Sequence, residues 1–187
     1  RDKGTKGQRG AVAGSCFFAL HLEDFSMSWD HEHWMGMALE EARAAGAEGE
    51  VPVGAVLVDG EGRLTATGRN RVVGRNDPTA HAEILALRAG AESAGNYRLL
   101  NRFLYVTVEP CLMCMGAIVH ARISTLIFGA PDPKWGAAGS LYDFSADPRL
   151  NHRVTVIGGA REAACRELIQ GFFRERRKRK GATWRTQ

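Results

Sequence analysis

Two short segments of this chain, PTAHAEI and EPCLMC, each place reactive side chains where a helix is expected to begin. In the first segment, His81 and Glu83 follow a proline, a residue favoured in the first turn of a helix. In the second, Cys111 and Cys114 also follow a proline, and their i, i+3 spacing puts both sulfurs on one helix face. The positive potential of a helix N-terminus favours the thiolate, which is the form of cysteine that binds metals. If the fold brings these two helix starts together, their side chains can form a single site.

The four side chains together supply what a catalytic zinc site needs. His81, Cys111 and Cys114 offer one imidazole and two thiolates, and three protein ligands leave a fourth zinc position for water. Zinc lowers the pKa of bound water from about 16 toward roughly 7, so that hydroxide is available at neutral pH. Glu83 is close enough in sequence to accept and pass on the proton. The sequence predicts Zn²⁺, one per subunit, as the cofactor and Glu83 as the catalytic proton shuttle.

The specificity of this pattern comes from the combination of its two halves. A lone C-x-x-C also occurs in redox pairs and in partial structural zinc sites, and a lone H-x-E is weaker still. H-x-E followed by P-C-x-x-C, here about thirty residues later, is the signature of the zinc-dependent nucleobase deaminases.

Apolar runs and helical patterns alternate along the chain, which predicts an α/β fold with a mixed sheet. One antiparallel hairpin, closed by the DGEG turn, precedes strands that are linked by crossover helices. The expected elements are a helix from Ser28 or Asp30 to Gly46, strands 53–58 and 64–68, a helix from Asp77–Pro78 to about Ala94, strand 103–108, a helix from Glu109–Pro110, strands 125–130 and 153–158, and a helix from about Arg161.

The length of 187 residues suits one compact domain with residues to spare at both ends. We expect the domain to span residues 27–180, followed by a C-terminal tail over residues 181–187. Residues 1–26 are basic and glycine-rich and then moderately apolar, which only weakly resembles a secretory signal peptide. We therefore expect residues 1–26 to be an N-terminal extension upstream of Met27, either disordered or a non-native leader.

The cysteine content and the hydropathy favour a cytoplasmic protein without a membrane span. Four cysteines are too few for the disulfide framework of a secreted domain, so a reducing compartment fits better. The sequence has no apolar run of about 18 residues, the length that a transmembrane helix requires.

A dense basic block, RERRKRK, lies near the C-terminus of a chain whose net charge is only +4. Such a block is compatible with a polyanionic partner, but a solvated tail that serves solubility is an equally good interpretation.

Five segments closely resemble the bacterial tRNA-specific adenosine deaminases of the cytidine/deoxycytidylate deaminase superfamily. They are EVPVGAVLVD, GRNRVVGRNDPTAHAEI, NYRLLNRFLYVTVEPCLMCMGAIVHARI, FGAPDPKWGAAGSLYDF and NHRV, within a resemblance that runs from about Met27 to Arg177. The resemblance implies a three-layer cytidine-deaminase-like fold, with a five-stranded mixed sheet flanked by helices, in a homodimer. It also implies hydrolytic deamination of the wobble adenosine of a tRNA anticodon to inosine, with release of ammonia.

The resemblance also assigns roles to individual residues. His81, Cys111 and Cys114 correspond to the zinc ligands and Glu83 to the proton shuttle. The positions that correspond to contacts with the tRNA anticodon stem-loop are Asn70, which holds the target base, Asp132 and Lys134 in a loop, and Phe172, Phe173 and Arg174 at the end of the last helix. Trp135 departs from the family pattern, which has a smaller or polar residue there; stacking on an RNA base and packing against the long loop are both open for it.

Three other functions remain to be distinguished. A deaminase of free nucleobases or nucleosides would not need the basic C-terminal helix. A non-catalytic tRNA-binding subunit with a structural zinc would have no use for Glu83. A C-x-x-C redox protein would leave the His81–Glu83 pair unexplained.

Overall fold

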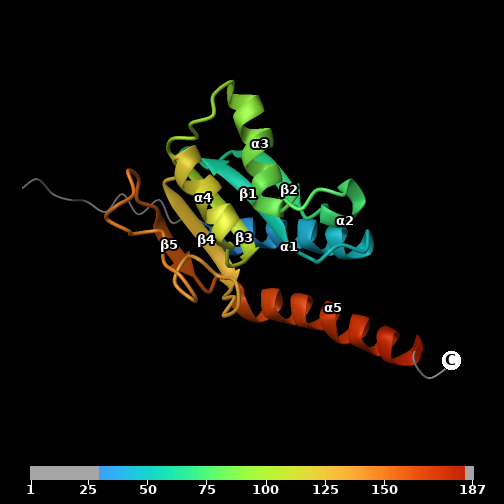
Figure 1. The fold of residues 1–187 in the computed structure, drawn as a ribbon. Helices are drawn as coiled ribbons and strands as arrows, with labels where there is room; N and C mark the ends of the chain where they lie inside the picture. Colours follow the sequence, from blue (N-terminus) through green and yellow to red (C-terminus); the bar gives the residue numbers. More distant parts are fainter. Residues whose placement is uncertain (1–29, 184–187) are drawn as a thin grey trace, which may run out of the picture.

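Five strands form a single mixed sheet in the order β2-β1-β3-β4-β5 (Figure 1). The structure, a computed structural model, describes residues 30–183, so the extension expected at residues 1–26 lies outside the described residues. The pairs β1–β2 and β1–β3 are antiparallel, whereas β3–β4 and β4–β5 are parallel. The strands are β1 (Gly54–Asp59), β2 (Leu64–Arg69), β3 (Arg102–Val108), β4 (Thr125–Ala130) and β5 (Thr155–Gly158). The expected five-stranded mixed sheet is confirmed.

Helices cover both faces of this sheet and complete three layers (Figure 1). The helices are α1 (His31–Ala47), α2 (Val72–Arg75), α3 (Ala82–Ala94), α4 (Leu112–Ala121) and α5 (Glu162–Thr183). None of the helices within residues 30–183 is long and apolar enough to cross a membrane. The last helix runs three residues past the expected domain end at residue 180.

The two faces of the sheet belong to separate hydrophobic cores. Along β1, Ala55 and Leu57 pack with α3 and α4, whereas Val56 and Val58 pack with α1 and α5. This alternation follows from the two-residue period of a β-strand. Both faces of the central strands are apolar because helices cover both of them, as is usual where parallel strands are present.

Two glycines allow helices to lie directly on the strands that lead to the site. A Cβ atom on Gly68 of β2 would lie 2.3 Å from the carbonyl oxygen of Ala82, at the start of α3. A Cβ atom on Gly54 of β1 would lie 2.1 Å from the carbonyl oxygen of Ala38 in α1. The contact at Gly68 fixes the height of the α3 N-terminus above the sheet.

The expected start of α3 at Asp77–Pro78 is wrong by four residues. The Asp77 carboxylate accepts hydrogen bonds from the backbone N–H of Thr79, at 2.8 Å, and from its hydroxyl, at 2.7 Å. These bonds form a tight turn in place of a helix cap. The helix itself starts at Ala82, whose N–H donates to the side-chain oxygen of Asn70 at 2.9 Å.

The other differences at helix ends are smaller. α4 starts at Leu112 instead of Glu109–Pro110, and α1 ends at Ala47, one residue beyond Gly46. Asp30 caps α1 by accepting a hydrogen bond from the N–H of His33. The short helix α2 lies between the expected strand 64–68 and the helix expected from Asp77–Pro78, where no helix was predicted.

Candidate metal centre

His81 and Cys111 occupy equivalent positions, as the N-cap residues of α3 and α4. Both have an extended backbone, with φ −73° and ψ 154° at His81 and φ −73° and ψ 172° at Cys111. The two helices pack against the same face of the sheet. Two neighbouring helix starts therefore hold the imidazole and the first thiol next to each other.

The three expected ligands meet at one point between these helix starts. The Nδ1 atom of His81 lies 3.7 Å from the Sγ atom of Cys111 and 3.6 Å from that of Cys114. All three ligand atoms lie within 4.8 Å of one another. A tetrahedral zinc ion with ordinary Zn–N and Zn–S bond lengths separates a nitrogen ligand from a sulfur ligand by about 3.6 Å. The triangle therefore has the right size for zinc.

The electrostatics of the cluster favour a thiolate at Cys111. The Cys114 thiol donates toward the Cys111 sulfur, and this contact, with a smaller one from His81, lowers the pKa of Cys111 to about 4 despite its burial. The same shared proton, together with burial and the charge of Glu83, raises the pKa of Cys114. The hydrogen bond with Cys111 also raises the pKa of His81. A metal ion that binds here displaces the proton shared by the two sulfurs.

Glu83 lies inside the first turn of α3 and is almost completely buried, with 4% of its surface exposed. Burial raises the pKa of its carboxyl group, because a charged carboxylate is poorly solvated there. The carboxyl is within hydrogen-bonding reach of the Cys114 sulfur. A buried carboxyl with a raised pKa beside a metal site is suited to both accepting and donating a proton.

Asn70 anchors the backbone of the segment that carries His81 and Glu83. It follows β2 and is 7% exposed, and its side-chain oxygen accepts the hydrogen bond from the N–H of Ala82. Ala82 lies between His81 and Glu83, so Asn70 holds the segment that carries both.

Glu109 organises the loop beside the metal centre, a role that the sequence interpretation missed. This residue was expected only to open a helix, but its side chain is 3% exposed and accepts four hydrogen bonds. One carboxylate oxygen accepts from the N–H groups of Ala138 and Ser140, and the other from the N–H of Asp132 and the Ser140 hydroxyl. The available signal was an acidic residue at the buried end of a strand, directly before a ligand-bearing turn.

The loop held by Glu109 presents Lys134 and Trp135 to solvent. Asp132 accepts hydrogen bonds from the N–H groups of Lys134, at 2.9 Å, and Trp135, at 3.2 Å, so its carboxylate shapes the turn. Trp135 is 70% exposed. The next residue, Gly136, forms a β-bridge with Cys111, which ties this loop to the metal triangle.

The expected contacts on α5 are not part of this cluster. The rings of Phe172 and Phe173 lie edge to face, with their centroids 5.5 Å apart. The Arg176 guanidinium lies over the Phe172 ring and also donates to the carbonyl oxygen of Gly49. Arg174 is exposed on this part of α5, which projects away from the sheet in Figure 1. Within residues 30–183, no hydrogen bond or ring contact joins Phe172, Phe173 or Arg174 to the metal triangle.

Comparison with known proteins assigns the chain to a family. Residues 27–130 match the family described as the cytidine and deoxycytidylate deaminase zinc-binding region. A tRNA-specific adenosine deaminase from Haemophilus influenzae is 51% identical over 149 residues, which cover 80% of this chain and 86% of that protein. This chain belongs to the tRNA-specific adenosine deaminase family. The expected zinc cofactor is confirmed by the zinc-binding family match and by the geometry of the triangle.

Solved structures of two kinds of deaminase share the fold. One, from work on A-to-I editing by tRNA:A34 deaminases at the wobble position of transfer RNA, has a TM-score of 0.70 and 48% identity. It covers 73% of this chain, which in turn covers 98% of it. A guanine deaminase from Nitrosomonas europaea has a TM-score of 0.64 and 29% identity, with 75% of this chain and 83% of that chain covered. The fold is thus common to both kinds, whereas the identity favours the tRNA deaminases.

Proposed function

We propose that this protein deaminates the wobble adenosine of a tRNA anticodon to inosine, by hydrolysis with release of ammonia. The observation that carries the proposal is the buried carboxyl of Glu83 beside the triangle of His81, Cys111 and Cys114. The tRNA substrate is supported by the curated relative at 51% identity and by the structural neighbour at 48%.

His81, Cys111 and Cys114 would hold the zinc ion. When bound, zinc supplies the Lewis acidity that makes water a nucleophile at neutral pH. The remaining chemistry is the movement of protons, which the protein has to provide through a side chain that is close by and shielded from bulk water.

Glu83 is the side chain that we assign to this movement. Its carboxylate accepts a proton from the attacking water and delivers it to N1 of adenine while the new C6–O bond forms. It then carries the remaining hydroxyl proton to the amino nitrogen, which leaves as ammonia when the C6–N bond breaks. Water is consumed and ammonia released, and the raised pKa of Glu83 suits both proton acceptance and donation.

Two groups of residues would bind the RNA. Asn70, which binds the backbone between His81 and Glu83, would hold the target base, while Asp132 and Lys134 would lie beside the anticodon backbone. Exposure of the Lys134 side chain supports such a contact, and the hydrogen bonds of Asp132 support an indirect role in shaping the loop. Taking a base from a single-stranded loop costs less than opening a duplex, which suits an anticodon.

The end of α5 would supply the second group of contacts, through Phe172, Phe173 and Arg174. Phe173 and Arg174 are exposed, and the helix around them is strongly basic. Because α5 projects from the body, this surface is open to a large polyanion (Figure 1).

We also infer that the protein acts as a homodimer in the cytoplasm. Leu112 and Met113 in the first turn of α4, and Val73 on α2, are large exposed apolar side chains, as expected for a surface that a second copy covers. The three described cysteines are free, which fits a reducing compartment. Light scattering at micromolar concentration should give the mass of two chains; the mass of one chain would contradict the dimer.

The decisive experiment is incubation with transcribed tRNA that carries adenosine at the wobble position, followed by sequencing for an A-to-G change. Free adenosine, cytidine and guanine serve as competing substrates in parallel reactions. Guanine is included because the fold is shared with a guanine deaminase. Turnover of guanine without conversion of the tRNA would assign the chain to free nucleobases instead.

A further inference from the structure

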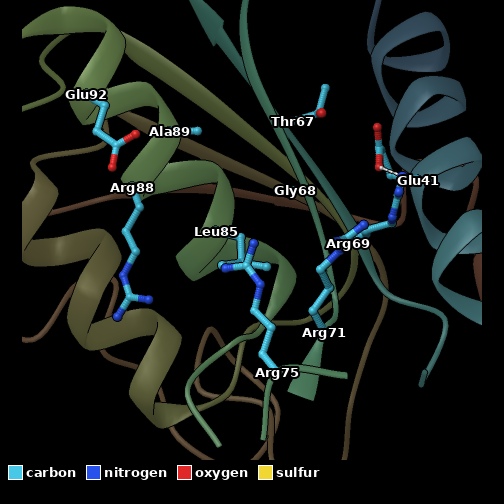
Figure 2. Close-up of a pocket in the computed structure, with 10 residues that line it drawn as sticks. All are labelled: Glu41, Thr67, Gly68, Arg69, Arg71, Arg75, Leu85, Arg88, Ala89 and Glu92. Atoms are coloured by element: carbon cyan, nitrogen blue, oxygen red, sulfur yellow. Dashed lines mark hydrogen bonds and ion pairs between the residues drawn. The ribbon is translucent and has the colours of Figure 1, made fainter. Parts of the chain in front are cut away.

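A depression of about 380 Å³ lies on the side of the molecule formed by β2, α2 and α3, and arginines dominate its lining (Figure 2). The four arginines come from three elements: Arg69 ends β2, Arg71 and Arg75 lie at the two ends of α2, and Arg88 lies on α3. The acidic residues of the lining are Glu41 and Glu92. Glu48 and Asp77 also contact these arginines, so the charge that the depression offers to a ligand depends on which guanidinium groups are left weakly paired.

Two of the four arginines are already neutralised. Arg69 forms ion pairs with Glu41 at 3.0 Å and with Glu48 at 2.9 Å, and Figure 2 shows it turned toward Glu41. Arg71 lies 3.4 Å from the other oxygen of Glu48. These pairs hold the β2 end of the depression in place.

The other two arginines lack strong partners. Within residues 30–183, the exposed Arg75 guanidinium makes no hydrogen bond or ion pair and acts on the Asp77 carboxylate only through its charge. Arg88 reaches only Asp77, at 3.9 Å, and more than half of its side chain is exposed. Thr79 bonds one Asp77 oxygen and Arg88 faces the other, but an exposed ion pair of this length holds Arg88 only weakly. Two guanidinium groups are therefore available to an anion from outside.

The depression adjoins the metal centre. Leu85, which contributes to its lining, lies one helical turn from His81 and donates its N–H to the His81 carbonyl oxygen. Arg71 directly follows Asn70, and its N–H donates to the carbonyl oxygen of Ala80. One helical turn is about 5.4 Å long, so parts of the lining lie within about that distance, along the backbone, of the segment that carries His81.

We propose that this depression binds a phosphate group of the RNA backbone next to the target nucleotide, with Arg75 and Arg88 as the phosphate ligands. Guanidinium groups bind phosphate oxygens through paired hydrogen bonds, and they remain charged at any physiological pH. The inference rests on the proposed function, because it takes the substrate to be a nucleic acid.

The test compares Arg75→Gln/Arg88→Gln with a control, Arg98→Gln/Arg153→Gln, that removes the same charge. Arg98 follows α3 and Arg153 precedes β5. Both lie near the end of the sheet where β3 and β5 begin, whereas the metal centre lies at the end where β3 finishes. Binding of an anticodon stem-loop is measured by fluorescence anisotropy at several salt concentrations. Each protein also carries Glu83→Gln, so that the RNA is not consumed.

The Arg75/Arg88 variant should bind the stem-loop about 5- to 20-fold more weakly at moderate salt, and the slope of log K against log salt should fall by about one to two. The control should keep most of the affinity and the original slope. With Glu83 intact, the loss should appear in KM and not in kcat, since the phosphate lies away from the reacting atoms. An affinity and slope equal to those of the control would overturn the proposal.

Two further measurements distinguish an RNA phosphate from a free anion and from a second copy of the protein as the partner of this depression. If inorganic phosphate or pyrophosphate stabilises the protein through this arginine pair while RNA binding is unaffected by the substitution, a free anion is the ligand and the backbone assignment fails. If the variant becomes monomeric in light scattering, the depression is an interface between copies, which also overturns it. The binding arm does not depend on turnover, so a protein that binds RNA through the pair without deaminating it would refute the proposed function and leave the phosphate site standing.

Discussion

His81 and Glu83 are two residues apart, yet a helix boundary separates their roles. His81 caps α3 with an extended backbone, whereas Glu83 lies in the first helical turn. If both residues were inside one helix, their side chains would point in nearly opposite directions, because they are two positions apart. The boundary frees the imidazole from the helical repeat, so that Nδ1 reaches the cysteines while the carboxyl stays buried beside them.

Glu83→Gln should abolish most turnover without loss of zinc. Glutamine has the shape of glutamate but cannot carry protons, and loss of general acid–base catalysis typically costs about 10²- to 10⁴-fold in rate. The thermal stability should be equal or higher, because the variant no longer buries an ionisable group. Rate measurements on wobble-adenosine tRNA, with zinc content by mass spectrometry, provide the check. Activity within a few fold of the wild type would rule out the shuttle role.

Cys111→Ala should lose zinc and stability together, since metal binding is coupled to folding. A chelator should lower the melting temperature of the wild type but have no further effect on this variant. Cys165→Ala is the matched control, because Cys165 is buried in the core between the sheet, α1 and α5 and away from the triangle. It should keep one zinc per chain and its sensitivity to the chelator. A full complement of zinc in Cys111→Ala would contradict the ligand assignment.

The sequence predicted those parts of the fold and the site that depend on short-range patterns of residues. The three ligand residues and the five strands could be recognised because ligand spacing and apolar periodicity are both local properties. The start of α3 could not be located from the sequence. Asp77–Pro78 has the residues of a helix start, but the first turn of α3 is instead fixed at Ala82 by a hydrogen bond to the distant Asn70. Tertiary contacts of this kind leave no local signal.

Glu109 is the clearest case of a site residue that only the fold reveals. Its carboxylate gathers donors from Asp132 to Ser140, more than twenty residues away. In sequence it was indistinguishable from an acidic residue at the first turn of a helix, a position that the helix dipole favours.

Glu109→Gln should therefore loosen the loop beside the metal centre. An amide has one accepting oxygen, so at least one backbone N–H, such as that of Asp132, is left without its acceptor, at a cost of about 1–3 kcal/mol. We expect a lower melting temperature, faster proteolysis within residues 131–145 and a higher KM for tRNA. Glu167→Gln, an exposed change of the same kind on α5, should leave all three unchanged. Wild-type proteolysis of the Glu109 variant would show that the carboxylate does not hold the loop.

Trp135→Ala should weaken RNA binding while leaving the chemistry intact. The indole is 70% exposed, but its backbone is held by Asp132 and adjoins the Gly136–Cys111 bridge, so a large aromatic surface is fixed at the edge of the site. Packing against the loop would have buried this side chain, and its exposure favours stacking on an RNA base instead. Such stacking contributes about 1–3 kcal/mol per base, which corresponds to a loss of about 5- to 150-fold in affinity.

The controls for Trp135 separate stacking from a general loss of apolar surface. Trp135→Phe retains an aromatic face and should recover much of the affinity lost in Trp135→Ala. Tyr97→Ala removes a ring that is similarly exposed, at 68%, but lies beyond the C-terminal end of α3, away from His81, and should have no effect. Stem-loop binding by anisotropy compares all three variants, with kcat at saturating tRNA as the measure of chemistry. Equal affinities for Trp135→Ala and the wild type would leave the indole without a role in RNA binding, because a stacked base cannot lose its platform without loss of binding energy.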